Sequence, residues 1–315
     1  MLNFAARKKE TFLIGLNFMR SGRAVCFPFF FILAICWCIV SGCEFVNPEE
    51  KVPSYIQVDT FSFQTADSTG FNTERISDVW IYVNNQIIGT YQVPTGKIPV
   101  LAEGLSNITI QAGVFADGIK GNRVYYPFYQ AYAAKMNLEK GKVSKVNPAF
   151  RYSDGLKKPF IFYQDFESSD SGFSKGRYGN LELERPLHEP GAPSAAFGAR
   201  YGKLTARTNE DIIEFSNNIF VPLRQNGMPV YLEFDYRSTC TLQVGLEGFV
   251  GSQAPQPYFD LVLLPADKWT KMYVSLSEET QKYFNNARFR FFLRTVPQPG
   301  ANNSFSIDNV RLINF

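Results

Sequence analysis

Residues 230–246 read VYLEFDYRSTCTLQVGL, and this stretch decides the fold class. Its apolar side chains occupy every second position, before and after a short polar break: Leu232, Phe234, Tyr236, Cys240, Leu242 and Val244. A period of two gives a β-strand one buried face, so the stretch predicts two consecutive strands of an all-β domain. Cys240 lies in the buried row, where a small hydrophobe is expected rather than a reactive thiol.

Two carboxylates, Glu233 and Asp235, share the opposite face of the first of these strands. A pair of carboxylates is the minimum that a glycoside hydrolase needs. The alternating apolar residues already occupy the buried face, so we expect this pair to lie on a solvated edge. Glycoside hydrolase is therefore a remote alternative.

Further strands are predicted on both sides of this stretch, and they place residues 158–315 in one β-sandwich. The joint with the preceding domain is predicted at Lys157-Lys158-Pro159, and Phe160–Glu167 opens the new domain. The other strands are expected at 212–215, 259–264, 271–276, 288–293 and 305–313.

Residues 54–157 predict a second, smaller β-sandwich. Val79–Val83 is followed by Asn84-Asn85-Gln86 and then by Ile87–Tyr91, a strand–turn–strand pattern. Shorter apolar runs at 55–58, 98–101, 108–110, 124–129 and 136–138 follow the spacing of an immunoglobulin-like sandwich. The predicted fold is thus all-β, with an Ig-like sandwich before a jelly roll.

The N-terminal part predicts export. Residues 27–43, FPFFFILAICWCIVSGC, form an apolar run preceded by Arg20 and Arg23 and ended by small residues. This order is typical of a secretory signal peptide; an uncleaved membrane anchor is the alternative. We expect residues 1–42 to be the signal peptide, with Met19 as the true start, and residues 43–53 to be a polar tether.

Charge and cysteine content limit the function classes. Residues 1–42 hold five of the 32 Lys and Arg and one of the 29 acidic residues, which leaves 27 basic and 28 acidic side chains in residues 43–315. Such a near-neutral surface argues against nucleic acid as a partner. Cys240 is the only cysteine after Cys43, so no disulfide is expected inside the folded part.

Several motifs resemble known families. Val40-Ser41-Gly42-Cys43 resembles the lipobox of bacterial lipoproteins, which implies acylation of Cys43. DVWIYVNNQIIGTYQVP (78–94) resembles PEGA-like or carboxypeptidase-regulatory-like sandwiches. Together with IPVLAEG (98–104), GIKGNRVYYPFYQAY (118–132) and FYQDFE (162–167), it is also similar to Bacteroidota outer-membrane lipoproteins of unassigned function. That resemblance implies a lipid-anchored protein of the outer membrane, exposed at the cell surface, with the periplasmic face as the alternative.

QDFE (164–167), DKWTKMYVSL (267–276) and SFSIDNVRL (304–312) resemble carbohydrate-binding-type jelly rolls. In that family the first and last strands are neighbours and many members hold a structural calcium ion there. The resemblance implies Asp165, Glu167 and Asp308 as calcium ligands; strand-end carboxylates facing water are the alternative. No other cofactor is expected.

Aromatic residues supply the candidate binding surfaces. Residues 125–132 hold Tyr125, Tyr126, Phe128, Tyr129 and Tyr132 around Pro127, which disfavours a central strand. This cluster is predicted to contact a partner protein, or else to form a seam with residues 160–166. Four aromatic residues near loops are candidates for a glycan platform, but core or interface packing is the favoured expectation for them: Tyr201, Phe249, Tyr258 and Trp269.

The remaining motifs indicate no catalysis. His188 is the only histidine, no G-x-S-x-G occurs, and zinc ligands are lacking. Asp67-Ser68-Thr69 resembles a Bacteroidota O-glycosylation sequon at Ser68, with a solvated turn as the alternative. The sequence therefore predicts a non-enzymatic accessory or scaffold lipoprotein, docked on an outer-membrane β-barrel protein and other lipoproteins. A surface glycan-binding lipoprotein is the alternative.

Overall fold

The computed structural model describes residues 50–65, 70–156, 160–189, 198–251, 254–283, 286–295 and 303–315. Residues 52–315 form one compact unit. The predicted signal peptide, Cys43, Ser68 and the joint at 157–159 lie outside the described residues. In the described part of the chain, no helix is long and apolar enough to span a bilayer.

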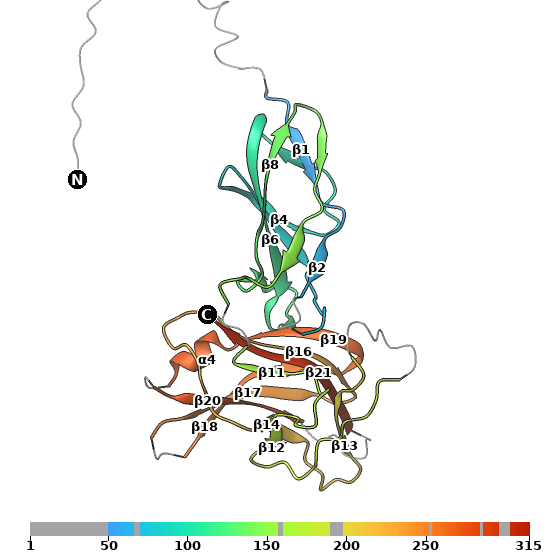
Figure 1. Cartoon of the computed structure of the whole chain (residues 1–315), viewed down its shortest axis with the longest axis vertical. Helices are drawn as coiled ribbons and strands as arrows, with labels where there is room; N and C mark the ends of the chain where they lie inside the picture. Colours follow the sequence, from blue (N-terminus) through green and yellow to red (C-terminus); the bar gives the residue numbers. More distant parts are fainter. Residues whose placement is uncertain are drawn as a thin grey trace, which may run out of the picture. The chain divides into compact units, whose positions relative to one another are not determined.

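The fold is all-β, as predicted, and its sheets divide between an earlier and a later part of the chain (Figure 1). The first sandwich contains three sheets, ordered β5-β1-β9, β10-β2 and β4-β3-β6-β7, with β8 also paired to β6. Its strands are β1 (Ser54–Gln57), β2 (Ser62–Gln64), β3 (Asp78–Val83), β4 (Gln86–Gln92), β5 (Ile98–Val100), β6 (Gly104–Phe115), β7 (Arg123–Tyr125), β8 (Tyr132–Leu138), β9 (Val143–Lys145) and β10 (Ala149–Arg151).

The turn between β3 and β4 follows directly from the sequence. Val83 pairs with Gln86, so only Asn84 and Asn85 connect the strands, and their φ angles are +50° and +66°. Asparagine tolerates positive φ better than most residues, and two such residues in a row match the twist of a tight hairpin. A short 3₁₀ turn, η2 (Ala116–Gly118), follows β6.

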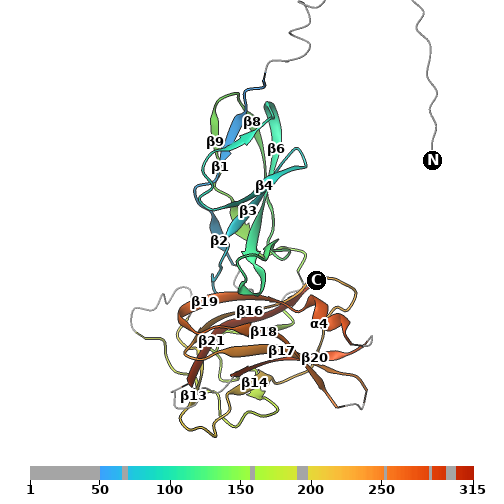
Figure 2. The ribbon, with the colours of Figure 1, turned by 180° about the vertical axis from the view of Figure 1, so that it is seen from behind.

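The second sandwich, a jelly roll, contains two sheets. One is ordered β11-β21-β16-β19, with β13 also paired to β21; the other is ordered β12-β14-β20-β17-β18, with β15 also paired to β20. Figure 2 shows β13, β21, β16 and β19 of the first of these sheets from behind. The strands are β11 (Phe162–Gln164), β12 (Phe173–Lys175), β13 (Gly202–Ala206), β14 (Glu214–Asn217), β15 (Val221–Pro222), β16 (Val230–Ser238), β17 (Leu242–Phe249), β18 (Gln256–Leu263), β19 (Ala266–Ser275), β20 (Arg288–Thr295) and β21 (Asn303–Asn314), and one short helix is α4 (Ser277–Gln281).

The core of the jelly roll lies between these two sheets. The alternating residues of β16 and β17 point into it, as predicted for Leu232, Phe234, Tyr236, Leu242 and Val244, and Leu246 continues the row. Cys240 is buried, which confirms its predicted role as a small hydrophobe. We call the other face of the β11-β21-β16-β19 sheet its outer face.

A second hydrophobic cluster joins the two sandwiches. It contains the core of the first sandwich together with Phe160, Tyr231, Tyr273 and Ile313 of the jelly roll. Tyr231, Tyr273 and Ile313 lie on the outer face, so the first sandwich covers part of that face.

Candidate functional site

The outer face carries an ordered array of polar side chains because neighbouring strands align them in rows. In the first row Glu233 of β16 lies between Arg311 of β21 and Tyr273 of β19. In the next row Asp235 lies between Asp308 and Lys271. The third row is centred on Arg237, which pairs with Ser306.

Glu233 is fully buried beneath the first sandwich. The hydroxyl of Tyr126 donates to its Oε1 (2.5 Å) and the hydroxyl of Tyr152 donates to its Oε2 (2.7 Å). Lys271 Nζ is 3.2 Å from Oε2 and Arg311 is 3.9 Å from it. Four groups from two sandwiches thus neutralise or bond one carboxylate.

The prediction that Glu233 and Asp235 face water is therefore wrong. They are 0% and 2% exposed. The alternation correctly put them on the face opposite the jelly-roll core, but a second layer of protein covers that face. Since Glu233 is enclosed by tyrosines and cations, it is not placed to meet a substrate.

The aromatic cluster at 125–132 is not an exposed surface. Tyr126, Phe128 and Tyr129 are buried, so they do not supply the exposed aromatic surface that was one of the grounds for the scaffold hypothesis. Tyr126 and Phe128 pack edge-on against Tyr231, and the Tyr129 and Tyr273 hydroxyls are hydrogen-bonded at 2.9 Å. The alternative is confirmed in that the cluster packs at a seam between the two sandwiches. It contacts mainly β16 and β19 there, rather than residues 160–166. At the ends of the cluster Tyr125 is exposed and Tyr132 is partly buried.

A segment of the first sandwich also crosses the outer face; we call residues Phe71–Arg75 the strap. The carbonyl of Phe71 accepts a hydrogen bond from Arg311 (2.8 Å). The Thr73 hydroxyl accepts one from Lys271 (3.3 Å), and the backbone N–H of Arg75 donates to the Tyr273 hydroxyl (2.9 Å). These bonds connect the strap to β21 and to β19.

A pocket of about 480 Å³ lies between the strap and β19. Its lining consists of Asn72, Thr73, Glu74, Arg75, Asp235, Lys268, Trp269, Thr270 and Lys271. Burial raises the pKa of Asp235 and lowers the pKa of Lys271, because both would carry charge away from water. We call this the strap pocket.

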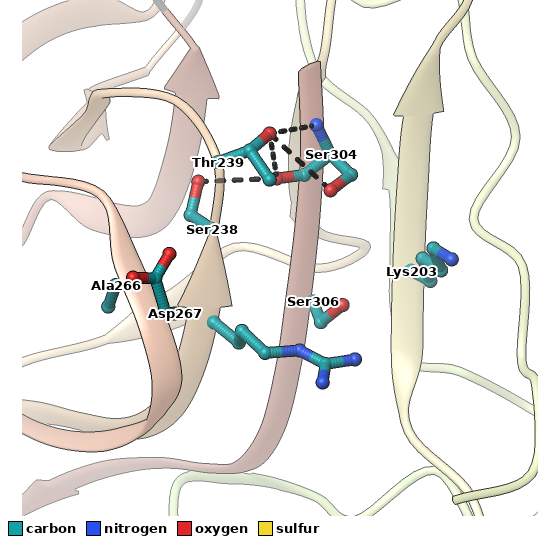
Figure 3. Close-up of a pocket in the computed structure, with 8 residues that line it drawn as sticks. Lys203, Ser238, Thr239, Ala266, Asp267, Ser304 and Ser306 are labelled. Carbon is teal, nitrogen blue, oxygen red and sulfur yellow. Dashed lines mark hydrogen bonds between the residues drawn. The ribbon is translucent and has the colours of Figure 1, made fainter. Parts of the chain in front are cut away.

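A second pocket, of about 250 Å³, lies next to the first along β16 and β19. Ala266 and Asp267 of β19 line it, directly before the residues of β19 that line the strap pocket. In Figure 3, Ser306 lies between Lys203 on β13 and Asp267 on β19, and Thr239 is bonded to Ser304 at the upper end. The other lining residues are Arg237 and Ser238. We call this the hydroxyl pocket.

Trp269 joins the two pockets. It lines the strap pocket, and the Arg237 guanidinium, which lines the hydroxyl pocket, lies 5.7 Å from the centre of its ring. Tyr201 packs edge-on against Trp269 with ring centres 5.4 Å apart, and the His188 ring lies 5.5 Å away. The indole therefore packs against three side chains while it remains partly exposed.

His188 is fixed by a buried carboxylate. Its Nε2 lies 3.1 Å from Asp308 Oδ2, and Asp308 is fully buried. Burial raises the pKa of Asp308 to about 7, although the bond to His188 acts in the opposite direction. This pair holds the His188 ring next to Tyr201 and Trp269, with ring centres 4.8 and 5.5 Å away.

The predicted platform is divided between the two sheets. Trp269 and Tyr201 belong together, whereas Phe249 of β17 packs on Phe220 and Tyr258 of β18 packs on Tyr283. Phe249 and Tyr258 therefore take no part in the site on the outer face.

The predicted calcium ligands do not converge. The first and last strands are neighbours, as expected, because β11 pairs with β21. However, Asp308 bonds His188, Glu167 accepts the backbone N–H groups of Ala199 and Arg200, and Asp165 accepts the Tyr163 hydroxyl. Nowhere in the described ranges do three or more His, Cys, Asp or Glu residues form a group suited to a metal.

Comparison with models of protein families and with curated proteins gives no match. Among solved structures, the chain is similar to a family 29 carbohydrate-binding module variant complexed with cellulohexaose (12% identity, 51% of this chain, 93% of that chain, TM-score 0.33). It is also similar to a carbohydrate-binding module of the β-sandwich superfamily (11% identity, 84% and 99%, TM-score 0.37) and to the enzymatically active domain of tailspike protein 4 of bacteriophage CBA120 (9% identity, 55% and 26%, TM-score 0.39). At these TM-scores the likenesses assign neither a family nor a ligand to this chain.

Proposed function

We propose that this protein binds glycans through a groove formed by the strap pocket and the hydroxyl pocket. The observation that carries the proposal is the position of Trp269, a partly exposed indole between two polar pockets on the outer face of the jelly roll. A sugar presents weakly polar C–H faces and a rim of hydroxyl groups. An aromatic ring with a few placed polar groups beside it is suited to both.

The polar groups around Trp269 are of two kinds, and each kind can form hydrogen bonds with sugar hydroxyl groups. Charged side chains such as Asp235 and Arg237 form stronger hydrogen bonds with hydroxyl groups than neutral side chains do. The hydroxyls of Ser304, Ser306 and Thr239 can donate and accept. Because each exposed hydrogen bond contributes little, we expect affinity to depend on the aromatic contact and on several bonds together.

We also propose that the protein is anchored at the cell surface by lipid on Cys43 and that it does not hydrolyse the glycans it binds. The apolar run 27–43 with its VSGC end supports the anchor. The enclosure of Glu233 supports the absence of hydrolysis, since the carboxylate pair that a glycosidase would use is not exposed as a pair.

Affinity electrophoresis of residues 52–315, the compact unit, tests the proposal. Gels would contain hydroxyethylcellulose, xylan, mannan, laminarin or polygalacturonate, one at a time. We expect at least one polymer to retard the protein and Trp269→Ala to abolish the retardation. Trp80→Ala is the matched control, because Trp80 of β3 is the other indole in this unit.

Retardation that survives Trp269→Ala, in a variant with an unchanged melting curve, would place glycan binding elsewhere and contradict the proposal. Absence of retardation by all five polymers would also count against it. Release of reducing ends from a retarding polymer would overturn the non-catalytic part alone.

A further inference from the structure

The strap pocket has walls from both sandwiches. The strap supplies Asn72, Glu74 and Arg75, whereas β19 of the jelly roll supplies Lys268, Trp269 and Thr270 on the other side. The three hydrogen bonds from Arg311, Lys271 and the Arg75 backbone hold the strap wall in place. A jelly roll without the first sandwich would therefore lack half of this pocket.

Asp235 lines the strap pocket and has one carboxylate oxygen without a hydrogen-bond partner in the described part of the chain, although the carboxylate also interacts with Thr73 and Asn309. Asp235 Oδ2 is buried and accepts no hydrogen bond from any residue that the structure describes. Its nearest cation is Lys271, with Nζ 3.8 Å away, which is beyond hydrogen-bond distance. A buried carboxylate oxygen without a donor costs free energy, so a donor that enters the pocket gains from bonding to it.

Arg75 differs from the other strap residues because its side chain is not needed to hold the strap. Its backbone N–H makes the bond to Tyr273, whichever side chain is present. Its guanidinium is exposed, and among the described residues its one hydrogen bond is to the carbonyl of Lys271, at the long distance of 3.5 Å. Most of its five donors therefore remain available to a molecule in the pocket.

We propose that the glycan site is shared between the two sandwiches, with Arg75 of the first sandwich as a ligand-binding residue opposite Trp269. This inference rests on the proposed function and extends it. An oligosaccharide lies between the indole and the strap, one hydroxyl donates to Asp235, and the Arg75 guanidinium donates to ring or hydroxyl oxygens on the opposite side. The ligand thereby contacts both sandwiches at once.

The test uses residues 52–315 and the polymers that retard them. Arg75→Ala should weaken binding about tenfold, the effect of removing one hydrogen bond from a charged group at a partly exposed site. Arg151→Ala is the matched control, because Arg151 is an exposed arginine of the first sandwich whose ion-pair partner is Asp154. The melting temperatures of both variants should stay close to that of the parent.

Equal binding by the Arg75→Ala and Arg151→Ala proteins would overturn the shared site. If Trp269→Ala still abolished binding in that case, the proposed function would stand and only its extension to the first sandwich would fall. If no polymer bound the parent protein, both proposals would be contradicted together.

Asp235→Asn gives a second measurement of the same site. Asparagine keeps the size of the side chain but replaces one carboxylate oxygen with a donor, so a ligand hydroxyl loses its charged acceptor. We expect weaker binding of the same polymers, also by about tenfold. Unchanged binding by a folded Asp235→Asn protein would contradict the role of the unused oxygen.

Discussion

Glu233→Gln should destabilise the protein more than any other isosteric change on the outer face. The substitution removes the charge that faces Lys271 and Arg311, which are themselves buried. The amide keeps one acceptor oxygen, so only one of the two tyrosine hydroxyls retains its partner. Lys271 then keeps Asp235, 3.8 Å away, as an ion-pair partner.

The expected loss is about 3–5 kcal/mol, the usual effect of removing one partner from a buried ion pair. The orphaned tyrosine hydroxyl belongs to the same network, so its contribution of about 1–3 kcal/mol is not added in full. Glu139→Gln is the control, because Glu139 pairs with Lys142 at an exposed position and should change stability by less than about 0.5 kcal/mol.

Urea unfolding of two single-indole forms of residues 52–315, which lack Trp37, measures this effect on both sandwiches. With Trp80→Phe the fluorescence reports on the jelly roll, and with Trp269→Phe it reports on the first sandwich. In the parent the two transitions should coincide, because Glu233 joins the sandwiches. With Glu233→Gln both midpoints should fall and the transitions should separate. Coincident transitions with a loss below about 1 kcal/mol would refute the reasoning.

Three further predictions concern single groups. The pKa of Asp308 is raised from 3.8 to about 7 in the folded state, so the native protein binds the extra proton and the free energy of unfolding should fall as pH rises from about 4 to 7. Asp308→Asn should remove that slope in urea titrations at each pH; an unchanged slope would contradict it. Cys240 is buried and burial raises its pKa, so a thiol reagent should modify it only on unfolding. Fast labelling in native buffer would show that the region opens. Gly245→Ala would place a Cβ 2.3 Å from the Phe292 ring and 2.5 Å from the backbone carbonyl oxygen of Tyr258, so it should cost about 1–3 kcal/mol. The cost should appear as a lower melting temperature, and an unchanged melting temperature would contradict the prediction.

The strand pattern was predictable because it depends on local alternation. The period of two in residues 230–246 correctly placed Leu232 and Phe234 in the core and Glu233 on the opposite face. The hairpin at Asn84-Asn85 followed from turn chemistry alone. These features depend on neighbouring residues and need no knowledge of the rest of the fold.

The coverage of the outer face was not predictable in the same way. An outward-facing strand position is normally wet, and nothing local says that a second sandwich covers it. One signal was present: β16 and β19 carry Tyr231 and Tyr273 at the same parity as the charged residues, which is unusual for a face in water. The strap and the His188–Asp308 pair depend on how distant loops cross the sheet, so no spacing in the sequence indicated them.

The most direct test of the glycan site is a fluorescence titration of the Trp80→Phe form of residues 52–315, in which Trp269 is the only indole. The account predicts a saturable change in its emission with each polymer that retards the protein in gels, and about a tenfold higher midpoint after Arg75→Ala. A retarding polymer that leaves the Trp269 emission unchanged at saturation would contradict the account.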